Sequence, residues 1–381
     1  MCIRDRGRRV HFAGSAKPTV EPSRLRCTHI LLKHLSKIVL EQGGGLVLTV
    51  GSDPVHPQET NLPLIFDWTL LEAVDEYKHW RTTSWPEAQG MPVVAVGLSN
   101  WKERITNKRQ PLWDRVVRVK NVELIQIREG LSVGGVLRER QAIYGDILVP
   151  VGGGPGVEHL AELYKSKRKP VIPLDISLGD KALSAAEQLS TQAMENPIEF
   201  FEYEPHSGAV AAYSELSLKD RRPNVEEFAD RFLDFITHLP RPTAFLVRLL
   251  NAKFPDFVEV ERFFRNVVDP VLADSGYRRF EMGTDPSTEP FMNVEIFQKL
   301  HYSSLAIADL TGLRVDCFTE MGYAFGQAKK VIATAREGTK LPFDSKSIPC
   351  HFWSADLEDQ KRRDAFRQFM HKNINRKPLV S

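Results

Sequence analysis

Residues 305–326 read LAIADLTGLRVDCFTEMGYAFG, and this stretch predicts a strand, a turn and a helix of a parallel α/β sheet. An apolar run ends at Asp309, and polar and glycine residues follow it. The helical pattern that comes next contains Glu320. Because ligands bind at the carboxyl ends of parallel strands, these two carboxylates are candidates for chemistry.

Glu320 has two interpretations. A carboxylate in the first turns of a helix is stabilised by the helix dipole, and Asp316 stands where an N-cap residue is expected, so no function is required. A carboxylate can also attack or stabilise the positive C1′ of a ribose when an N-glycosidic bond breaks. A second carboxylate, here Asp309, can orient the ribose hydroxyls. We therefore take Glu320 and Asp309 as candidate catalytic residues.

The alternation of apolar runs and helical patterns covers two regions of the chain. The first is predicted to have strands at 45–50, 91–98, 146–151 and 169–174 and helices at 28–42, 61–79, 132–142 and 156–167. The second is predicted to have strands at 243–250, 277–283, 304–310, 329–334 and 351–353 and helices at 257–275, 290–302, 317–328 and 356–373. The expected fold class is α/β, with two Rossmann-like or flavodoxin-like parallel-sheet domains joined by a helical linker.

The two ends of the first region set the predicted boundaries. Residues 1–26 hold seven Lys or Arg against two Asp or Glu and lack periodicity, so we expect a disordered tail, and MCIRDR resembles translated adapter DNA. A nucleotide-binding domain is expected over 27–185, a linker over 186–241 and a second domain over 242–381. The linker contains an apolar stripe at helical spacing, formed by Val225, Phe228, Phe232, Phe235 and Ile236. That stripe fits a hinge, a dimerisation element or a helix packed on its own neighbouring domain.

Composition excludes several classes of protein. Hydrophobic residues make up 42% of the chain and charged residues 26%, which is typical of soluble globular proteins, and no apolar run is long enough to span a bilayer. Outside residues 1–26 the chain carries 44 basic and 47 acidic residues, which argues against nucleic acid as a partner. The four cysteines lie far apart without a CxxC motif, so we expect no disulfide framework, no metal site and a cytoplasmic location.

A glycine-rich turn marks the first region. Residues 146–174 read DILVPVGGGPGVEHLAELYKSKRKPVIPL, a strand, a turn, a helix and another strand. The backbone amides of such a turn and of the following helix can cradle a phosphate, although a tight turn also needs glycine for geometry alone. A second small-residue turn follows the strand at 45–50. The residues that we expect to bind a nucleotide are Gly51, Ser52, Asp53, Gly152, Gly153, Gly154, Gly156 and, by its charge, Arg138.

Together these segments resemble the SLOG superfamily of nucleotide-binding Rossmann-like domains, in the branch associated with sirtuin-type or TIR-type effectors. Enzymatic members of that superfamily carry P-G-G-x-G-T-x-x-E. Here Val157 stands at the threonine position, and His159 and Leu160 stand where acidic residues belong. Glu158 is one step early. The resemblance therefore implies a domain that senses a small nucleotide without hydrolysing it.

The second region resembles the nucleoside 2-deoxyribosyltransferase and TIR-like group. ADLTG at 308–312 and EMGYAFG at 320–326 match a strand ending in A-D-L-T-G and a helix reading E-L-G-Y-A. The resemblance implies that Glu320 is the catalytic glutamate and that Asp309 orients the substrate. The residues expected to contact the substrate are Arg248, Asn251, Asp285 and Asp316.

These resemblances predict an effector that senses a nucleotide and cleaves the N-glycosidic bond of NAD or a related nucleotide, in prokaryotic antiviral defence. No cofactor is expected beyond the nucleotide substrate and the nucleotide that regulates it. The expected partners are a small nucleotide and further copies of the chain, with no nucleic acid and no membrane. Two alternatives remain open: a metabolic nucleoside hydrolase or 2-deoxyribosyltransferase, and a non-catalytic nucleotide-binding module that signals by oligomerising.

Overall fold

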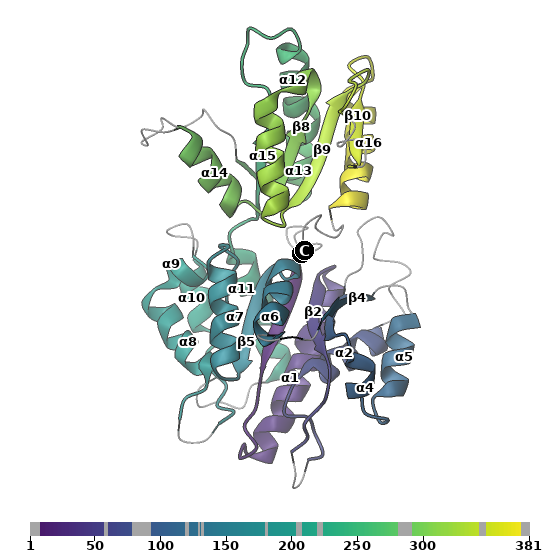
Figure 1. Ribbon diagram of the computed structural model, residues 1–381. Helices are drawn as coiled ribbons and strands as arrows, with labels where there is room; N and C mark the ends of the chain where they lie inside the picture. The colour runs from purple at the N-terminus through teal and green to yellow at the C-terminus, as the bar shows by residue number, and fades with distance from the viewer. Residues whose placement is uncertain are drawn as a thin grey trace. The chain divides into compact units, whose positions relative to one another are not determined.

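Two compact units make up the chain in a computed structural model. It describes residues 8–56, 60–77, 93–118, 122–128, 130, 133–179, 182–202, 208–218, 224–280, 292–342 and 348–374. The described residues up to Pro240 form the N-terminal unit and those from Arg241 onward form the C-terminal unit. Each unit contains a five-stranded sheet in which every pairing is parallel (Figure 1). The predicted fold class, two Rossmann-like or flavodoxin-like α/β domains, is confirmed.

The sheet of the N-terminal unit has the strand order β4-β3-β2-β1-β5. Its strands are β1 (Arg9–Ser15), β2 (Gly45–Val50), β3 (Val93–Leu98), β4 (Val122–Ile127) and β5 (Ile147–Gly152). The chain moves outward from β1 to β4 on one side and then returns to place β5 on the other side of β1. The strand order therefore reverses between β1 and β5, and open α/β sheets bind ligands outside the carboxyl ends of strands at such a point.

The predicted tail at 1–26 is wrong for its described part. Residues Arg9–Ser15 form β1, which lies between β2 and β5, and Val10 and Phe12 are buried. The prediction relied on the charge excess of residues 1–26. In the structure Arg9 is buried and its amide donates to Asp146 (2.9 Å), so a charged residue here did not indicate disorder.

The predicted strand at 169–174 is also absent. Only Val171 and Leu174 make isolated parallel bridges to β5. Pro170 and Pro173 have no amide hydrogen, so this segment cannot form a continuous ladder.

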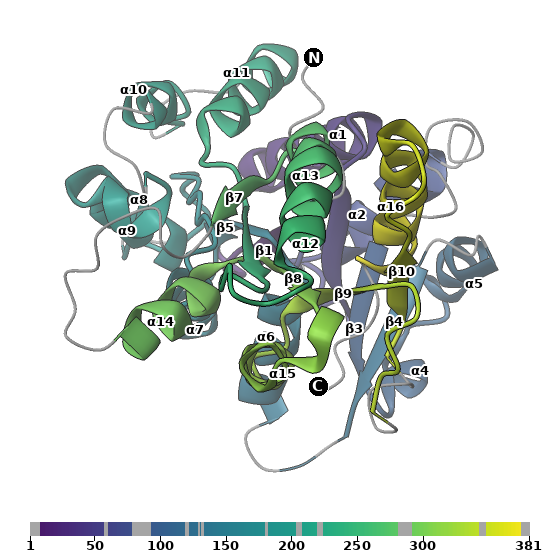
Figure 2. The same cartoon turned by 90° about the horizontal axis from the view of Figure 1, so that it is seen from above.

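Helices cover both faces of this sheet because its strands are apolar on both sides. On one face lie α1 (Pro22–Glu41) and α2 (Asp67–Glu76), and on the other lie α6 (Val133–Tyr144) and α7 (Pro155–Lys165) (Figure 2). The short helices α4 (Trp101–Arg104) and α5 (Gln110–Arg118) lie between β3 and β4 in the chain. Both faces of the sheet are therefore buried, as a parallel sheet requires.

The expected linker at 186–241 belongs to the N-terminal unit instead. It contains α8 (Ala185–Glu195), α9 (Pro197–Phe200), α10 (Ala209–Ser214) and α11 (Val225–His238). Phe228, Phe232 and Phe235 of α11 are buried in the same core as β1, and the rings of Phe232 and Phe12 are 6.3 Å apart. The structure supports packing on the neighbouring domain, so the apolar stripe needs no hinge or dimer contact to bury it.

The sheet of the C-terminal unit has the strand order β10-β9-β8-β6-β7. Its strands are β6 (Thr243–Val247), β7 (Arg278–Phe280), β8 (Leu305–Asp309), β9 (Lys330–Arg336) and β10 (Cys350–Trp353). Counted within the unit, this is the flavodoxin-like order 2-1-3-4-5, which reverses between β6 and β8. The stretch 305–326 thus lies at the reversal point of its sheet.

Two layers of helices enclose this second sheet. One face carries α12 (Phe257–Phe263), a π-helical turn (Phe264–Val268), α13 (Asp269–Asp274) and α16 (Asp359–Asn373). The other carries α14 (Met292–Tyr302) and α15 (Val315–Gly326), as Figure 2 shows. In the described part of the chain, no helix combines the length and the apolarity that crossing a bilayer requires.

Candidate functional site

The glycine turn lies at the reversal point of the N-terminal sheet. The amide of Gly153 donates to the carbonyl of Ser15 at the end of β1 (2.8 Å). Gly152 and Gly153 have φ values of +66° and +76°, which L side chains rarely adopt. A Cβ on Gly152 would also lie 2.5 Å from the Ser15 carbonyl oxygen. Glycine is therefore required at both positions by the turn itself.

Gly154 differs from its two neighbours. It is the N-cap of α7 in an extended conformation (φ −143°), and a Cβ built on it would meet nothing within 4 Å. Within the described residues, the amides of Gly154 and Gly156 donate to no backbone carbonyl. Free amides at the start of an eleven-residue helix make a place that favours an anion. Gly154 thus borders open space at the point where a phosphate would bind.

Arg138 lies beside this turn, as the sequence suggested. Its Nε donates to Nδ1 of His159 (2.9 Å), and its Nη1 lies 3.3 Å from where a Cβ of Gly156 would be. The side chain comes from α6, which packs on α7. The structure thus brings Arg138, Gly154 and Gly156 together.

Sequence reasoning missed Ser15 and Lys17 because it placed them in a tail. The amide of Lys17 donates to the carbonyl of Leu178 (2.9 Å), and the Leu178 side chain lies against Gly152. Lys17 is exposed and adds a second cation near the turn. The alternation of Val10 and Phe12 before a small-residue turn was the available signal.

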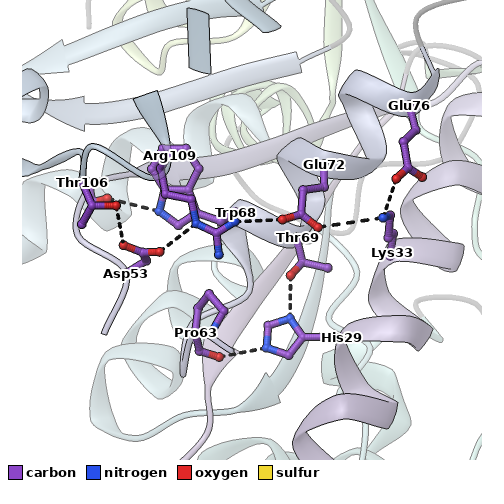
Figure 3. A network of polar contacts seen from close by, with 11 residues as sticks. His29, Lys33, Asp53, Pro63, Trp68, Thr69, Glu72, Glu76, Thr106 and Arg109 are labelled. Carbon is purple, nitrogen blue, oxygen red and sulfur yellow. Dashed lines mark hydrogen bonds and ion pairs between the residues drawn. The ribbon is translucent and has the colours of Figure 1, made fainter. Parts of the chain in front are cut away.

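The second predicted turn plays a different part. Gly51, Ser52 and Asp53 follow β2, which β1 separates from β5. The Asp53 side chain is only 5% exposed and accepts hydrogen bonds from Arg109 (2.8 Å) and Thr106 (3.3 Å), as Figure 3 shows. Both of its oxygens are therefore occupied by the protein, whereas Ser52 is exposed.

A polar network extends from Asp53 across α2 to α1. Arg109 pairs with Glu72 (2.8 Å) and lies over the ring of Trp68, and Lys33 pairs with Glu76 (2.6 Å) (Figure 3). Because the inner pair is buried, each charge depends on its partner for solvation. The network therefore holds the loop after β2 in place.

Glu320 lies on α15, immediately after the reversal point of the C-terminal sheet. Burial raises the pKa of the Glu320 carboxyl to about 7, and the negative charge of Asp316 adds to the rise. Among the described residues, Glu320 has no hydrogen bond or ion pair. Perturbed carboxyl groups of this kind gather at functional sites. Glu320 is thus a half-buried carboxyl group that is available to a ligand and titrates near neutral pH.

Asp309 is held by the protein. Its side chain accepts hydrogen bonds from the Thr311 amide (3.1 Å), Thr334 Oγ1 (2.7 Å) and Trp353 Nε1 (3.0 Å), and the residue is 1% exposed. Burial raises the pKa of Asp309. The side chain therefore ties β8 to β9 and β10.

We expect Asp309→Ala to cost about 2 kcal/mol of unfolding free energy, because Trp353 Nε1 and Thr334 Oγ1 would lose their acceptor in the core. Asp309→Asn keeps an acceptor and should cost less. Urea unfolding measures both, with Asp316→Asn as an exposed control. A substrate-orienting role predicts the opposite pattern, in which Asp309→Asn loses activity while its unfolding midpoint stays unchanged.

Two of the remaining predicted substrate contacts are occupied by neighbouring protein groups. Arg248 at the end of β6 is buried and paired with Glu261, and it lies over the ring of Phe264. The Asn251 side chain caps its own loop by accepting from the Lys253 amide (3.0 Å).

The other two predicted contacts are Asp316 and Asp285. Asp316 pairs with Arg314 (3.2 Å) and is the second residue of α15, so it is not the N-cap. Asp285 lies outside the described residues. Where side chains are described, no three His, Cys, Asp or Glu gather as a metal site would require.

Comparison with known proteins places the N-terminal unit. The family described as "ATP nucleosidase Cap17-like, N-terminal" matches residues 6–226, more than half of the chain. The chain belongs to this family. The match includes β1, the glycine turn and the start of α11, and it ends before the C-terminal unit begins.

Two curated Cap17 proteins show the same relation. ATP nucleosidase Cap17 of Escherichia coli strain KTE188 is 26% identical over 171 residues, which cover 45% of this chain and 32% of the relative. A second Escherichia coli protein of that name has the same figures. The chain thus matches about a third of the length of these Cap17 relatives.

Solved structures add little to the family assignment. DNA processing protein A of Helicobacter pylori, which binds single-stranded DNA, covers 61% of this Cap17-like chain and 83% of its own, with a TM-score of 0.34 and 10% identity. The molybdenum cofactor carrier protein of Chlamydomonas reinhardtii covers 49% and 96%, with a TM-score of 0.27 and 18% identity. At these scores neither likeness carries a conclusion.

Proposed function

We propose that the chain cleaves the N-glycosidic bond of an adenine nucleotide in its C-terminal unit and binds a regulatory nucleotide in its N-terminal unit. Glu320 carries this proposal, because it is a half-buried carboxyl group without a hydrogen-bond partner among the described residues, at the reversal point of a flavodoxin-like sheet. The name of the Cap17 relatives supports ATP as substrate. The resemblance of residues 305–326 to the TIR-like group supports NAD.

The chemistry requires one carboxylate and water. As the bond between C1′ and the base nitrogen breaks, the base leaves with the electron pair and positive charge develops on C1′. Ionised Glu320 stabilises that charge or bonds to C1′. A water molecule then adds its oxygen to C1′, breaking the bond to Glu320 where one has formed, and loses a proton. Adenine leaving ATP takes up a proton, whereas nicotinamide leaves NAD already neutral and the proton goes to solvent. The products are the free base and the phosphorylated sugar.

The N-terminal unit fits a regulatory site rather than a second catalytic site. Its glycine turn offers free amides and two cations, Arg138 and Lys17. Val157, His159 and Leu160 stand where the pattern of enzymatic SLOG proteins has threonine and acidic residues. A ligand that prefers the active state by about 1–3 kcal/mol would change activity roughly 5–150-fold. From the resemblance to the SLOG and TIR-like groups we also propose a role in antiviral defence, in which the regulator is a nucleotide that signals infection.

The proposal predicts base release from ATP or NAD with a characteristic pH profile. Because ionised Glu320 is the active form and its pKa is about 7, the rate should rise with pH through about 7 and level off above 8. Asp316→Asn removes the neighbouring negative charge and should shift the profile to lower pH. Mass spectrometry of the products, with and without cyclic nucleotides, measures the rate.

Two results would contradict the proposal. The first is the absence of base release from every nucleotide and nucleoside tested. The second is a profile that follows an ordinary glutamate and does not move in Asp316→Asn.

A further inference from the structure

Two loops meet at the reversal point of the C-terminal sheet. One loop follows β6 and leads into α12, and the other follows β8 and leads into α15. The guanidinium of Arg314 lies 4.1 Å from the ring centre of Phe254, and a Cβ on Gly312 would lie 3.5 Å from Oδ2 of Asp256. The two loops therefore lie side by side at the start of α15, the helix that carries Glu320.

This surface is unusually apolar for an exposed edge. Large hydrophobic side chains that the fold leaves exposed occur on both loops and at the start of the following helices: Leu250, Phe254, Val258, Leu313 and Val315. Single exposed hydrophobic residues need no explanation, but a group of them rimmed by charges is typical of a binding site.

Two arginines stand at the same edge in weak ion pairs. Arg314 is 26% exposed and pairs with Asp316 (3.2 Å), which is itself 76% exposed. Arg336, at the end of β9, is 40% exposed and pairs with Asp256 (3.4 Å). Exposed pairs of this kind contribute little to stability, so an anion of higher charge can replace the carboxylates at small cost.

Both arginines are tied to the segment that runs from β8 into α15. The amide of Arg336 donates to Oγ1 of Thr311 (2.9 Å), in the loop that leads into α15. Arg314 forms an ion pair with Asp316. Asp316 and Glu320 share one face of α15, about 6 Å apart along its axis. Both arginines therefore lie at the carboxyl edge of the sheet that leads into α15, Arg314 as the N-cap of that helix and Arg336 at the end of the neighbouring strand β9.

We propose that Arg314 and Arg336 bind the phosphate groups of the substrate, so that the C-terminal unit acts on nucleotides and discriminates against nucleosides. The guanidinium fork matches phosphate geometry, and the exposed apolar side chains offer surface to the base. Arg248 does not take part, because it is buried against Glu261. This inference rests on the proposed N-glycosidase activity and adds to it the residues that hold the phosphate groups and the discrimination against nucleosides.

The test compares adenosine with AMP, ATP and NAD as substrates of the full chain, with base release as the readout. We expect kcat/KM for nucleotides to exceed that for adenosine at least tenfold. Arg314→Ala and Arg336→Ala should each raise KM for ATP about 10- to 100-fold, as loss of a charged hydrogen bond predicts, and leave cleavage of adenosine unchanged. Arg367→Ala is the matched control, because Arg367 pairs with Asp274 at the amino edge of β7.

A variant that lowers KM for ATP would distinguish phosphate binding by Arg336 from a purely structural role. Asp256→Asn removes the carboxylate that competes for Arg336, and α12 has no side-chain cap at that residue to lose. KM for ATP should therefore fall severalfold, and this variant carries the test if an alanine variant does not fold. Equal cleavage of adenosine and ATP, or an unchanged KM in Asp256→Asn, would overturn the inference while leaving N-glycosidase activity intact. No base release from any substrate would overturn the proposed function itself.

Discussion

Glu320→Gln is expected to reduce base release at least a hundredfold while leaving the fold intact. Glutamine has nearly the same shape but cannot ionise, so it can neither stabilise the charge on C1′ nor bond to it. The fold disfavours the ionised form of Glu320, because burial raises its pKa to about 7. The neutral amide should therefore leave the unfolding midpoint unchanged, or raise it, at pH 8.

Glu358→Gln provides a matched control for this change. Glu358 is exposed at the start of α16 and makes no side-chain cap, so its replacement should affect neither activity nor stability. Initial rates of base release and urea unfolding of both variants decide the matter. If Glu320→Gln turns over the authentic substrate at the original rate, Glu320 is not catalytic.

Gly154→Val should weaken nucleotide binding to the N-terminal unit at least a hundredfold. Its extended backbone accepts a β-branched residue, and a Cβ there meets no protein atom within 4 Å, so the turn can keep its shape. The new side chain would instead occupy the space in front of the free amides of α7, where a phosphate would bind.

Calorimetry of the full chain measures this effect, because β1 lies within the sheet and a shorter fragment that begins after it would not fold. Gly130→Val is the control, since Gly130 follows β4 at the far end of the sheet and also faces open space. Gly153→Ala is unsuitable, because its Cβ would lie 2.4 Å from Val157. Calorimetry should use nucleotides that the protein binds without cleaving. If Gly154→Val and the unaltered chain bind each of them with equal affinity, there is no phosphate site at this turn.

The local pattern of apolar and turn residues was sufficient to predict many of the strands and helices. The strand predicted at 45–50 is β2 to the residue, and the strand and helix predicted at 304–310 and 317–328 are β8 and α15 within two residues. These segments are apolar runs with clear turn residues at their ends, and such signals lie within a few residues of each other. The position of Glu320 at a carboxyl edge follows from the same pattern.

Signals that depend on distant partners were misread. The charge excess of residues 1–26 concealed the strand at Arg9–Ser15, which pairs with β2 and β5. The phenylalanines of α11 indicate only that something must cover them, and the covering surface is Phe12 and its neighbours, more than two hundred residues earlier in the chain.

The α/β class, the glycine turn and the helix that carries Glu320 could be predicted from the amino-acid sequence, because periodicity and backbone freedom are properties of neighbouring residues. Which carboxylates are available depends instead on contacts between distant segments. Asp309 and Asp53 look like ligand-binding acids in the sequence, but Trp353, Thr334 and Arg109 occupy them. The same structure leaves Glu320 without such a partner in its described part. Hydrogen-bond donors that satisfy a buried carboxylate come from strands and loops far along the chain, so burial and pairing appear only once the sheet has formed.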